Sequence, residues 1–475
     1  PAFLPTLLLA ANIDAELGEF ERAENGLNAV IAKEPDNIPA RRALLALLLK
    51  TQRKEKALSV AQDLLTRAPE QSAVLKLAAA AHLLAGDAKT SQALFAKALA
   101  LAAPDAQVLM GLGLAHMAGG ATEQGVKALL QASAVDESSV SADLFLVRHY
   151  IDSKQFDKGL QIIAARSERH PPDGRFALLE GELLAAAGRK PEALAAFDRA
   201  IALGPEVVAA LRELARLERA EGKPERVRQR FVEALARRPK DADLLLLYAN
   251  WLDERPAERT KVRATIEQAV AVAPESVEAR IALAAYYASR KDLDIALDVA
   301  EEAVKAIPGN VRLLSALAEL YQRAGKPEMA AMRQAEAVAA APASPELLVR
   351  LADFQSTGGA KDAAAASLHK ALGLRPGYEP AIVRVVAMEL EAARPEAALA
   401  AARDLQRSSP LAPTGYSLES KVLIQNDQWP EAMRVLKSGI ERTQSAQLVI
   451  DVHRTLTKAG RQQEAAGALA DWLQR

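Results

Sequence analysis

The stretch GRFALLEGELLAAAGRKPEALAAFDRAIALGPEV, at residues 174–207, decides the fold. Two apolar-periodic stretches flank a polar break at Gly188, and a proline stands near the end. A proline recurs at this place along the chain, at Pro35, Pro69, Pro104, Pro171, Pro205, Pro239, Pro274, Pro308, Pro342, Pro376 and Pro410. Successive members lie 34 or 35 residues apart, except across one gap of 67 in which Glu137 occupies the missing position. A fixed period of this length indicates a repeat array.

We expect a single array that covers the whole chain, residues 1–475. With the periodic proline at position 32 of a 34-residue unit there are fourteen units, the last one shortened. They begin near Leu4, Ile38, Ser72, Gln107, Val140, Gly174, Val208, Ala242, Val277, Val311, Pro345, Glu379, Pro413 and Gln447. Each unit is too small to bury its own apolar face, so it is stable only when it stacks on its neighbours.

Each unit is predicted to form two antiparallel helices. Glycines at the break between them permit the positive φ that ends a helix. These glycines are Gly18, Gly86, Gly120, Gly188, Gly222, Gly325 and Gly359. None of the 24 prolines lies inside a predicted helix, where it would cost about 3 kcal/mol. Half of the residues are hydrophobic but only 4% are aromatic, which suits closely packed helices better than sheets.

Small residues recur where the two helices of a unit must approach each other. Position 8 holds Ala11, Ala79, Gly181, Ala215, Ala249, Ala284, Ala318 and Ala352. Position 20 holds Ala23, Ala57, Ala193, Ala296, Ala330, Ala364, Ala398 and Ala432. Position 11 carries Tyr150, Tyr287 and Tyr321, which can fill the gap between one helix pair and the next. This pattern resembles the tetratricopeptide repeat. The resemblance implies an all-α, right-handed solenoid of about fourteen helix pairs that binds a partner protein or peptide in its concave groove.

Catalytic and cofactor motifs are missing from the sequence. The net charge is −1, which favours neither nucleic acid nor an anionic membrane as a partner. There is no cysteine, and no two of the six histidines share a helix face at metal-ligand spacing. The chain lacks a phosphate-binding glycine loop. We therefore expect a protein that is not an enzyme and that holds no metal or cofactor.

No membrane span is expected either. The longest uncharged run, residues 106–122, is shorter than the ~20 residues that a spanning helix needs. The chain opens with Pro-Ala-Phe rather than methionine, so we expect a piece of a longer protein. Any membrane attachment would then come from an anchor outside this segment.

In the tetratricopeptide family, positions 2, 5, 9 and 12 of the first helix line the groove. By that resemblance Arg212, Arg216 and Arg219 fall at positions 5, 9 and 12 of one unit. Such a face could receive an acidic peptide, a carboxylate or an anionic polysaccharide. The alternative is a solvated arginine face that Glu213 and Glu218 partly offset. Further groove candidates at these positions are Arg148, Asn250, Glu319 and Asp353.

The clamp that chaperone-docking members of the family use for a carboxylate is absent. It needs paired asparagine and basic residues on successive first helices, whereas Asn250 is followed in the next unit by Ala282 and Ala285. Chaperone co-factor function is therefore disfavoured.

The alanine-rich units and leucine-rich first helices, such as residues 313–320 and 347–351, resemble one bacterial group. These are the tetratricopeptide lipoproteins linked to exosortase (PEP-CTERM) protein sorting and exopolysaccharide systems. The resemblance implies a periplasmic or outer-membrane-anchored scaffold, and a cytoplasmic location stays open. Two other functions also stay open: the polysaccharide-binding or assembly arm of an export machine, and the regulatory repeat region of a larger enzyme.

Overall fold

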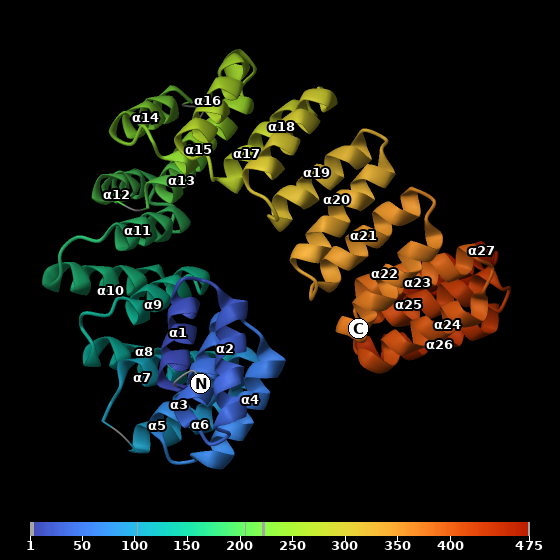
Figure 1. The fold of residues 1–475 in the computed structure, drawn as a ribbon, viewed down its shortest axis with the longest axis horizontal. Coiled ribbons are helices and arrows are strands. Elements are labelled where there is room, and N and C mark those ends of the chain that lie inside the picture. Colours follow the sequence, from blue (N-terminus) through green and yellow to red (C-terminus); the bar gives the residue numbers. More distant parts are fainter. Residues whose placement is uncertain (1–3, 102, 205, 221–223, 474–475) are drawn as a thin grey trace. The chain divides into compact units, whose positions relative to one another are not determined.

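The computed structural model describes residues 4–101, 103–204, 206–220 and 224–473. Across these ranges the chain forms 28 α-helices and one 3-10 turn, with no strand (Figure 1). The expected all-α repeat solenoid of about fourteen helix pairs is confirmed. Its predicted handedness stays a prediction. Pro205 and Gly222, which belong to the periodic proline and glycine sets, lie outside the described residues.

The chain divides into two compact units, Pro1–Ala234 and Leu235–Arg475. Whether the repeats form one array over residues 1–475 stays a prediction. The helices of the first unit are α1 (Leu4–Glu16), α2 (Phe20–Lys33), α3 (Ile38–Lys50), α4 (Lys54–Arg67), α5 (Ser72–Leu84), α6 (Ala88–Leu101), α7 (Ala106–Ala118), α8 (Thr122–Val135), α9 (Ser141–Asp152), α10 (Phe156–Arg169), α11 (Gly174–Ala186), α12 (Lys190–Leu203), α13 (Val207–Ala220) and α14 (Pro224–Arg237), whose last residues cross the division.

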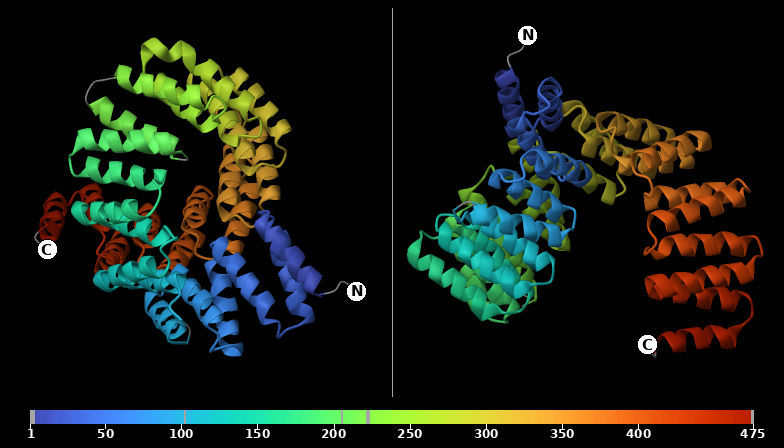
Figure 2. Two further views of the ribbon diagram at one scale, coloured as in Figure 1. Left: turned by 90° about the vertical axis from the view of Figure 1, so that its left-hand side faces the viewer. Right: turned by 90° about the horizontal axis from the view of Figure 1, so that it is seen from below.

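The helices of the second unit are α15 (Ala242–Asp253), the 3-10 turn η1 (Pro256–Glu258), α16 (Arg259–Val272), α17 (Val277–Ser289), α18 (Leu293–Ala306), α19 (Val311–Arg323), α20 (Pro327–Ala340), α21 (Pro345–Thr357), α22 (Lys361–Leu374), α23 (Glu379–Glu391), α24 (Pro395–Ser408), α25 (Pro413–Gln425), α26 (Trp429–Thr443), α27 (Ala446–Lys458) and α28 (Gln462–Leu473). Odd-numbered helices are the first helices of the repeats, and even-numbered helices are the second. In the right-hand view of Figure 2 the helices of the last repeats, in orange and red, lie side by side.

The turn between repeats explains the periodic proline. Pro308 follows the end of α18, and Asn310 two residues later accepts hydrogen bonds from the backbone amides of Arg312 and Leu313. A side-chain cap of this kind satisfies amides that have no partner inside the helix. Ser276 and Ser344 cap α17 and α21 in the same way, each two residues after its proline. The proline thus ends one helix, and the polar residue behind it begins the next.

The turn within each pair requires one residue in the left-handed region. The six described glycines of this turn have φ between +71° and +88°, as expected. In other repeats Gln52, Lys154, Lys291, Ala393 and Asp427 stand at the turn, each with positive φ. Pro256 cannot adopt that conformation because its ring fixes φ near −65°. The chain there forms the 3-10 turn η1 instead, and α16 follows it directly.

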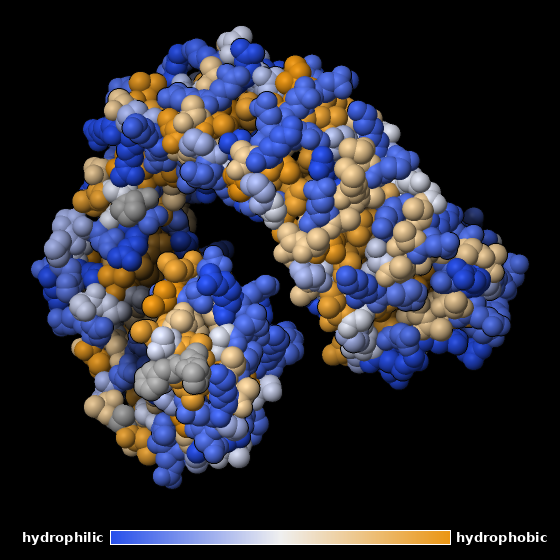
Figure 3. All heavy atoms as spheres, viewed as in Figure 1, coloured by the Kyte–Doolittle hydropathy of each residue, from blue (hydrophilic) through white to orange (hydrophobic). Residues whose placement is uncertain are grey.

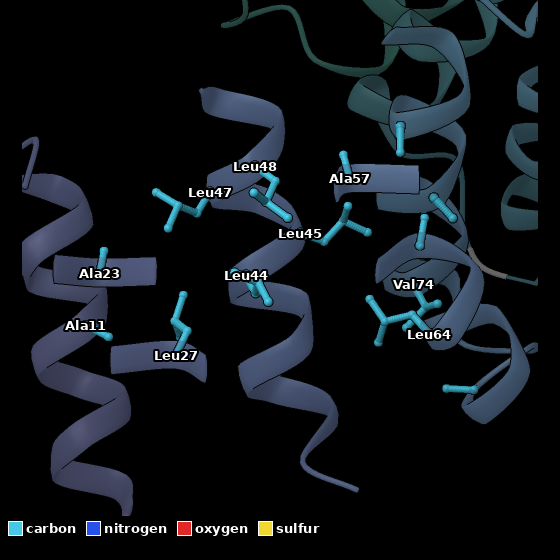
Figure 4. Packing of buried hydrophobic residues seen from close by; sticks show 14 residues of the cluster. Ala11, Ala23, Leu27, Leu44, Leu45, Leu47, Leu48, Ala57, Leu64 and Val74 are labelled. Carbon is cyan, nitrogen blue, oxygen red and sulfur yellow. The ribbon is translucent and has the colours of Figure 1, made fainter. Parts of the chain in front are cut away.

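The core lies between and within the helix pairs. The alanines at positions 8 and 20 are all buried, with at most 8% exposure. Figure 4 shows the first cluster, in which Leu27 of α2 lies between α1 and α3, and Leu64 of α4 lies beside Val74 of α5. Tyr321 fills a gap between pairs as expected, because its hydroxyl on α19 donates to the Glu301 carboxylate on α18 at 2.5 Å. On the face drawn in Figure 3 most residues are hydrophilic, with hydrophobic ones interspersed.

Candidate functional site: the first-helix face

We use the name first-helix face for the surface that carries the predicted groove residues of the odd-numbered helices, from Arg148 to Asp353. In the first unit, Arg148 of α9 is exposed and donates to the Glu182 carboxylate of α11. Arg212, Arg216 and Arg219 are exposed along α13, as the helical spacing predicts. Arg216 donates through Nε to Glu213 at 2.8 Å, and Arg219 also has a partner.

In the second unit the candidates lie on separate helices. Asn250 is exposed on α15. Glu319 of α19 accepts from Arg350 of α21. Asp353 of α21 accepts two hydrogen bonds from Arg384 of α23, at 2.5 and 2.8 Å, and this bidentate contact raises the pKa of the guanidinium. Side chains that the sequence suggested for a ligand are thus already held by the next repeat.

These contacts follow one rule over four successive first helices. An acidic residue on one helix pairs with an arginine on the next. The pairs are Glu278 of α17 with Arg312 of α19, Glu319 of α19 with Arg350 of α21, and Asp353 of α21 with Arg384 of α23. Each pair is partly exposed and contributes only about 0–1 kcal/mol. Together they leave this part of the face with little uncompensated charge.

The face changes character at its C-terminal end, where a pocket of about 430 Å³ lies across α23, α25 and α27. Only these three first helices line it. Val386 of α23 and Leu418 of α25 are buried in its floor, and the half-buried Leu390 and Ile424 extend the apolar surface. The volume lies within the roughly 300–1,000 Å³ of typical ligand sites.

Three cations and one carboxylate also line this pocket. Lys421 and Lys458 are exposed and make no hydrogen bond or ion pair within the described residues. Arg454 lies 3.8 Å from the Asp451 carboxylate on the same helix. Asp451 is buried, and its two oxygens accept from the Ser417 hydroxyl at 2.6 Å and from the Gln447 amide at 3.3 Å. The single negative charge is therefore satisfied, whereas the lysines are not.

A family model described as the tetratricopeptide repeat matches residues 146–208 and 263–311. The chain contains tetratricopeptide repeats. Arrays of such repeats present extended surfaces to other proteins, so this chain is built as a protein-interaction scaffold. No curated protein matches the sequence.

Three solved structures are similar to the tetratricopeptide chain. One is the crystal structure of the APC/C hetero-tetramer Cut9–Hcn1, with 14% identity, 96% of this chain and 97% of that chain covered, and a TM-score of 0.34. The structure of Naa15/Naa10 bound to HypK-THB gives 13% identity, 98% and 100% coverage and a TM-score of 0.39. The crystal structure of MamA gives 21% identity, 34% and 94% coverage and a TM-score of 0.30.

The pocket was missed by the sequence reasoning, which searched the tetratricopeptide groove positions for polar residues. Val383, Leu390 and Ile424 occupy positions 5, 12 and 12 of their units, and Lys421 occupies position 9. Apolar residues at groove positions in two successive units were the signal that could have revealed the pocket. Its closure by α27 depends on how three repeats stack, which no single unit encodes.

The second helices of the tetratricopeptide pairs offer smaller sites. A pocket of about 200 Å³ lies between α8, α9 and α10, where buried Asp143 accepts from Ser133 at 2.6 Å and from Arg166 at 3.1 Å. Its charges are thus paired internally. Among the described residues there is no group of three metal-ligating side chains, and no helix long and apolar enough to span a membrane.

Proposed function

We propose that this chain is a non-catalytic scaffold that binds a partner protein or peptide on its first-helix face. The observation that carries the proposal is the pocket shared by α23, α25 and α27, which combines an apolar floor with unpaired lysines. An apolar site with a few placed polar groups is the usual form of a binding pocket. The pocket is built from side chains of three successive repeats, which is how an array makes a surface that no single repeat can make.

Photo-crosslinking tests the proposal directly. A benzoylphenylalanine placed at Asn250 or Ala387, both exposed on first helices, is expected to capture a discrete partner in the native host. The same group at Lys370 or Lys437, exposed on the second helices α22 and α26, serves as the matched control. Equal capture at both sets of positions, or capture only at the second helices, would contradict the proposal.

We also propose a bacterial exopolysaccharide or PEP-CTERM sorting system as its setting, with the chain in the periplasm or anchored at the outer membrane. The support is the resemblance of the alanine-rich units and leucine-rich first helices to lipoproteins of that group. Alkaline phosphatase fused to the natural gene product provides the test, because the enzyme is active only after export. An inactive fusion in a host that exports control fusions would refute the periplasmic location.

The arginines of α13 favour a second candidate function, binding of an anionic polysaccharide. Arg212 is exposed and makes no ion pair within the described residues, so its charge is available to a ligand. Binding to alginate, used as the probe, should then weaken as salt is raised and be lost in an Arg212→Ala/Arg216→Ala variant. Alginate binding that is unchanged in this variant would exclude the α13 face.

A further inference from the structure

We infer that the pocket across α23, α25 and α27 selects an extended acidic peptide segment that carries an apolar side chain. This inference rests on the proposed function and names the class of partner that the first-helix face accepts. It follows from three features of the described residues: where the ion pairs between repeats stop, what already satisfies Asp451, and what forms the floor of the pocket.

The ion pairs stop at α23. Arg384 is the last arginine that pairs with the preceding first helix, and the next steps lack the partners that would continue the rule. Position 9 of α23 is Ala387 rather than an acidic residue, and α25 carries Leu418 where α21 and α23 carry Arg350 and Arg384. The cations beyond that point, on α25 and α27, are therefore not neutralised by neighbouring repeats. A ligand that brings carboxylates would supply the missing partners.

The sign of the ligand's charge follows from the pocket's own groups. Lys421, Arg454 and Lys458 are exposed at its edge, whereas Asp451 is buried and bonded to Ser417 and Gln447. The lining thus has more positive than negative charge, and its one carboxylate has hydrogen-bond donors already. Such a surface steers acidic partners toward it and repels basic ones.

The apolar floor distinguishes a peptide from a glycan. Leu390, Leu418 and Ile424 form a surface that a leucine or phenylalanine side chain would cover, whereas an anionic polysaccharide offers only hydroxyl and carboxylate groups. Neighbouring helix axes lie about 8–10 Å apart. Three first helices therefore span roughly 20 Å, which an extended chain at ~3.3 Å per residue covers with about six residues. The anchor would enter the floor while flanking acidic residues reach the lysines.

A phage-displayed library of random dodecapeptides, panned on the full chain, provides the test. Wild-type protein should enrich sequences that place Asp or Glu beside a leucine or phenylalanine. Synthetic capped peptides with the enriched sequence are then titrated by fluorescence anisotropy. The charge-reversed variant Lys421→Glu/Lys458→Glu should lose at least tenfold in affinity, and binding to the wild type should weaken as salt is raised.

The variant Lys437→Glu is the matched control, because this exposed lysine lies on α26 and does not line the pocket. Circular dichroism confirms that all variants keep their helices. A second variant, Leu390→Asp, tests the apolar floor independently of the lysines. Affinity should fall for this variant and stay unchanged for Lys437→Glu.

The failures are distinguishable. Enriched peptides without acidic residues, or full affinity in the charge-reversed variant, would overturn the inference and leave the proposed function standing. Displacement of the peptide by alginate with no contribution from the apolar anchor would also overturn it, in favour of a glycan. No enriched peptide, together with no crosslinked partner at Asn250 or Ala387, would remove the proposed function as well.

Discussion

At Gly325 the backbone turns between α19 and α20 with φ +71°, and a Cβ built there would meet no atom within 4 Å. The requirement at this position is therefore conformational and not a matter of space. Ala393 occupies the same turn between α23 and α24 with φ +56°, although it carries a Cβ. For L-residues the left-handed region costs about 1–2 kcal/mol, so the two turns differ in built-in strain.

We predict that Gly325→Ala destabilises the protein by about 1 kcal/mol, because the left-handed strain exceeds the ~0.4–1 kcal/mol gained from a less flexible unfolded chain. Ala393→Gly should have the opposite sign and a smaller size. Hydrogen exchange of the flanking helices measures both effects locally. If both substitutions shift stability in the same direction, the turn conformation is not what decides the residue.

A second residue-scale prediction concerns the hydroxyl of Tyr321. It donates to Glu301, which also accepts from Arg333 at 3.1 Å, and the tyrosine bond followed by the arginine charge lowers the pKa of that carboxyl. Tyr321→Phe should cost about 1.5 kcal/mol near pH 7, as expected for a hydrogen bond to a charged group. The measurement is denaturant unfolding of wild type and variant.

The pH dependence of this loss has a definite sign. A carboxyl whose pKa is lowered by folding contributes stability above its ordinary pKa, and that contribution disappears as the pH falls through the folded pKa. The difference between wild type and Tyr321→Phe should therefore shrink below about pH 4. Tyr287 lies at the same place in its repeat and makes no hydrogen bond through its hydroxyl within the described residues, so Tyr287→Phe is the control. A pH-independent difference would show that Glu301 is not the relevant acceptor.

At the scale of the helix pair, close approach decides which residues are small. Gly181 of α11 faces Phe197 of α12, and a Cβ on Gly181 would lie 2.4 Å from Cε1 of the ring. Phe197 is completely buried and has little room to move aside. The alanines at this position in other repeats face smaller side chains or wider gaps, whereas here a bulky ring takes the space that a Cβ would need.

We predict that Gly181→Ala loses about 1–3 kcal/mol through overpacking of the α11–α12 pair. Adding Phe197→Leu should recover part of that loss, because the smaller side chain leaves space for the new methyl group. Gly373→Ala in α22 is the control: nothing lies within 4 Å of its Cβ, so it should be neutral or stabilising. Thermal unfolding followed by circular dichroism ranks the variants. A destabilised Gly373→Ala, or no rescue by Phe197→Leu, would contradict the packing account.

The same scale shows what a sequence can and cannot predict here. The spacing of Gly325 and Pro308 is local information, and it predicts the turns and the helix pairs around them. The smallness of Ala330 follows from the same period. The partner of Asp353 does not, because the bond to Arg384 depends on which side chains two neighbouring repeats bring face to face. The pocket beside Lys421 needs three stacked repeats, so it could be found only from the structure.

For the whole molecule, a repeat array gains stability mainly from contacts between neighbours, so damage should stay local. Leu64 of α4 and Leu436 of α26 are both completely buried, in the first and second compact units respectively. Leu64→Ala should cost about 2–5 kcal/mol around α3–α6. Hydrogen exchange should rise in those helices and stay unchanged in α23–α27, and peptide binding at the pocket should be unaffected.

Leu436→Ala provides the mirror experiment, since it loosens α25–α27 and should weaken binding at the pocket while leaving α3–α6 protected. The reasoning is that local opening costs less than global unfolding where few contacts connect distant repeats. Mass-spectrometric hydrogen exchange on both variants gives the comparison in one measurement. If Leu64→Ala raises exchange equally in α3–α6 and in α23–α27, the chain unfolds as one cooperative body, and its C-terminal binding site depends on repeats far from it in the sequence.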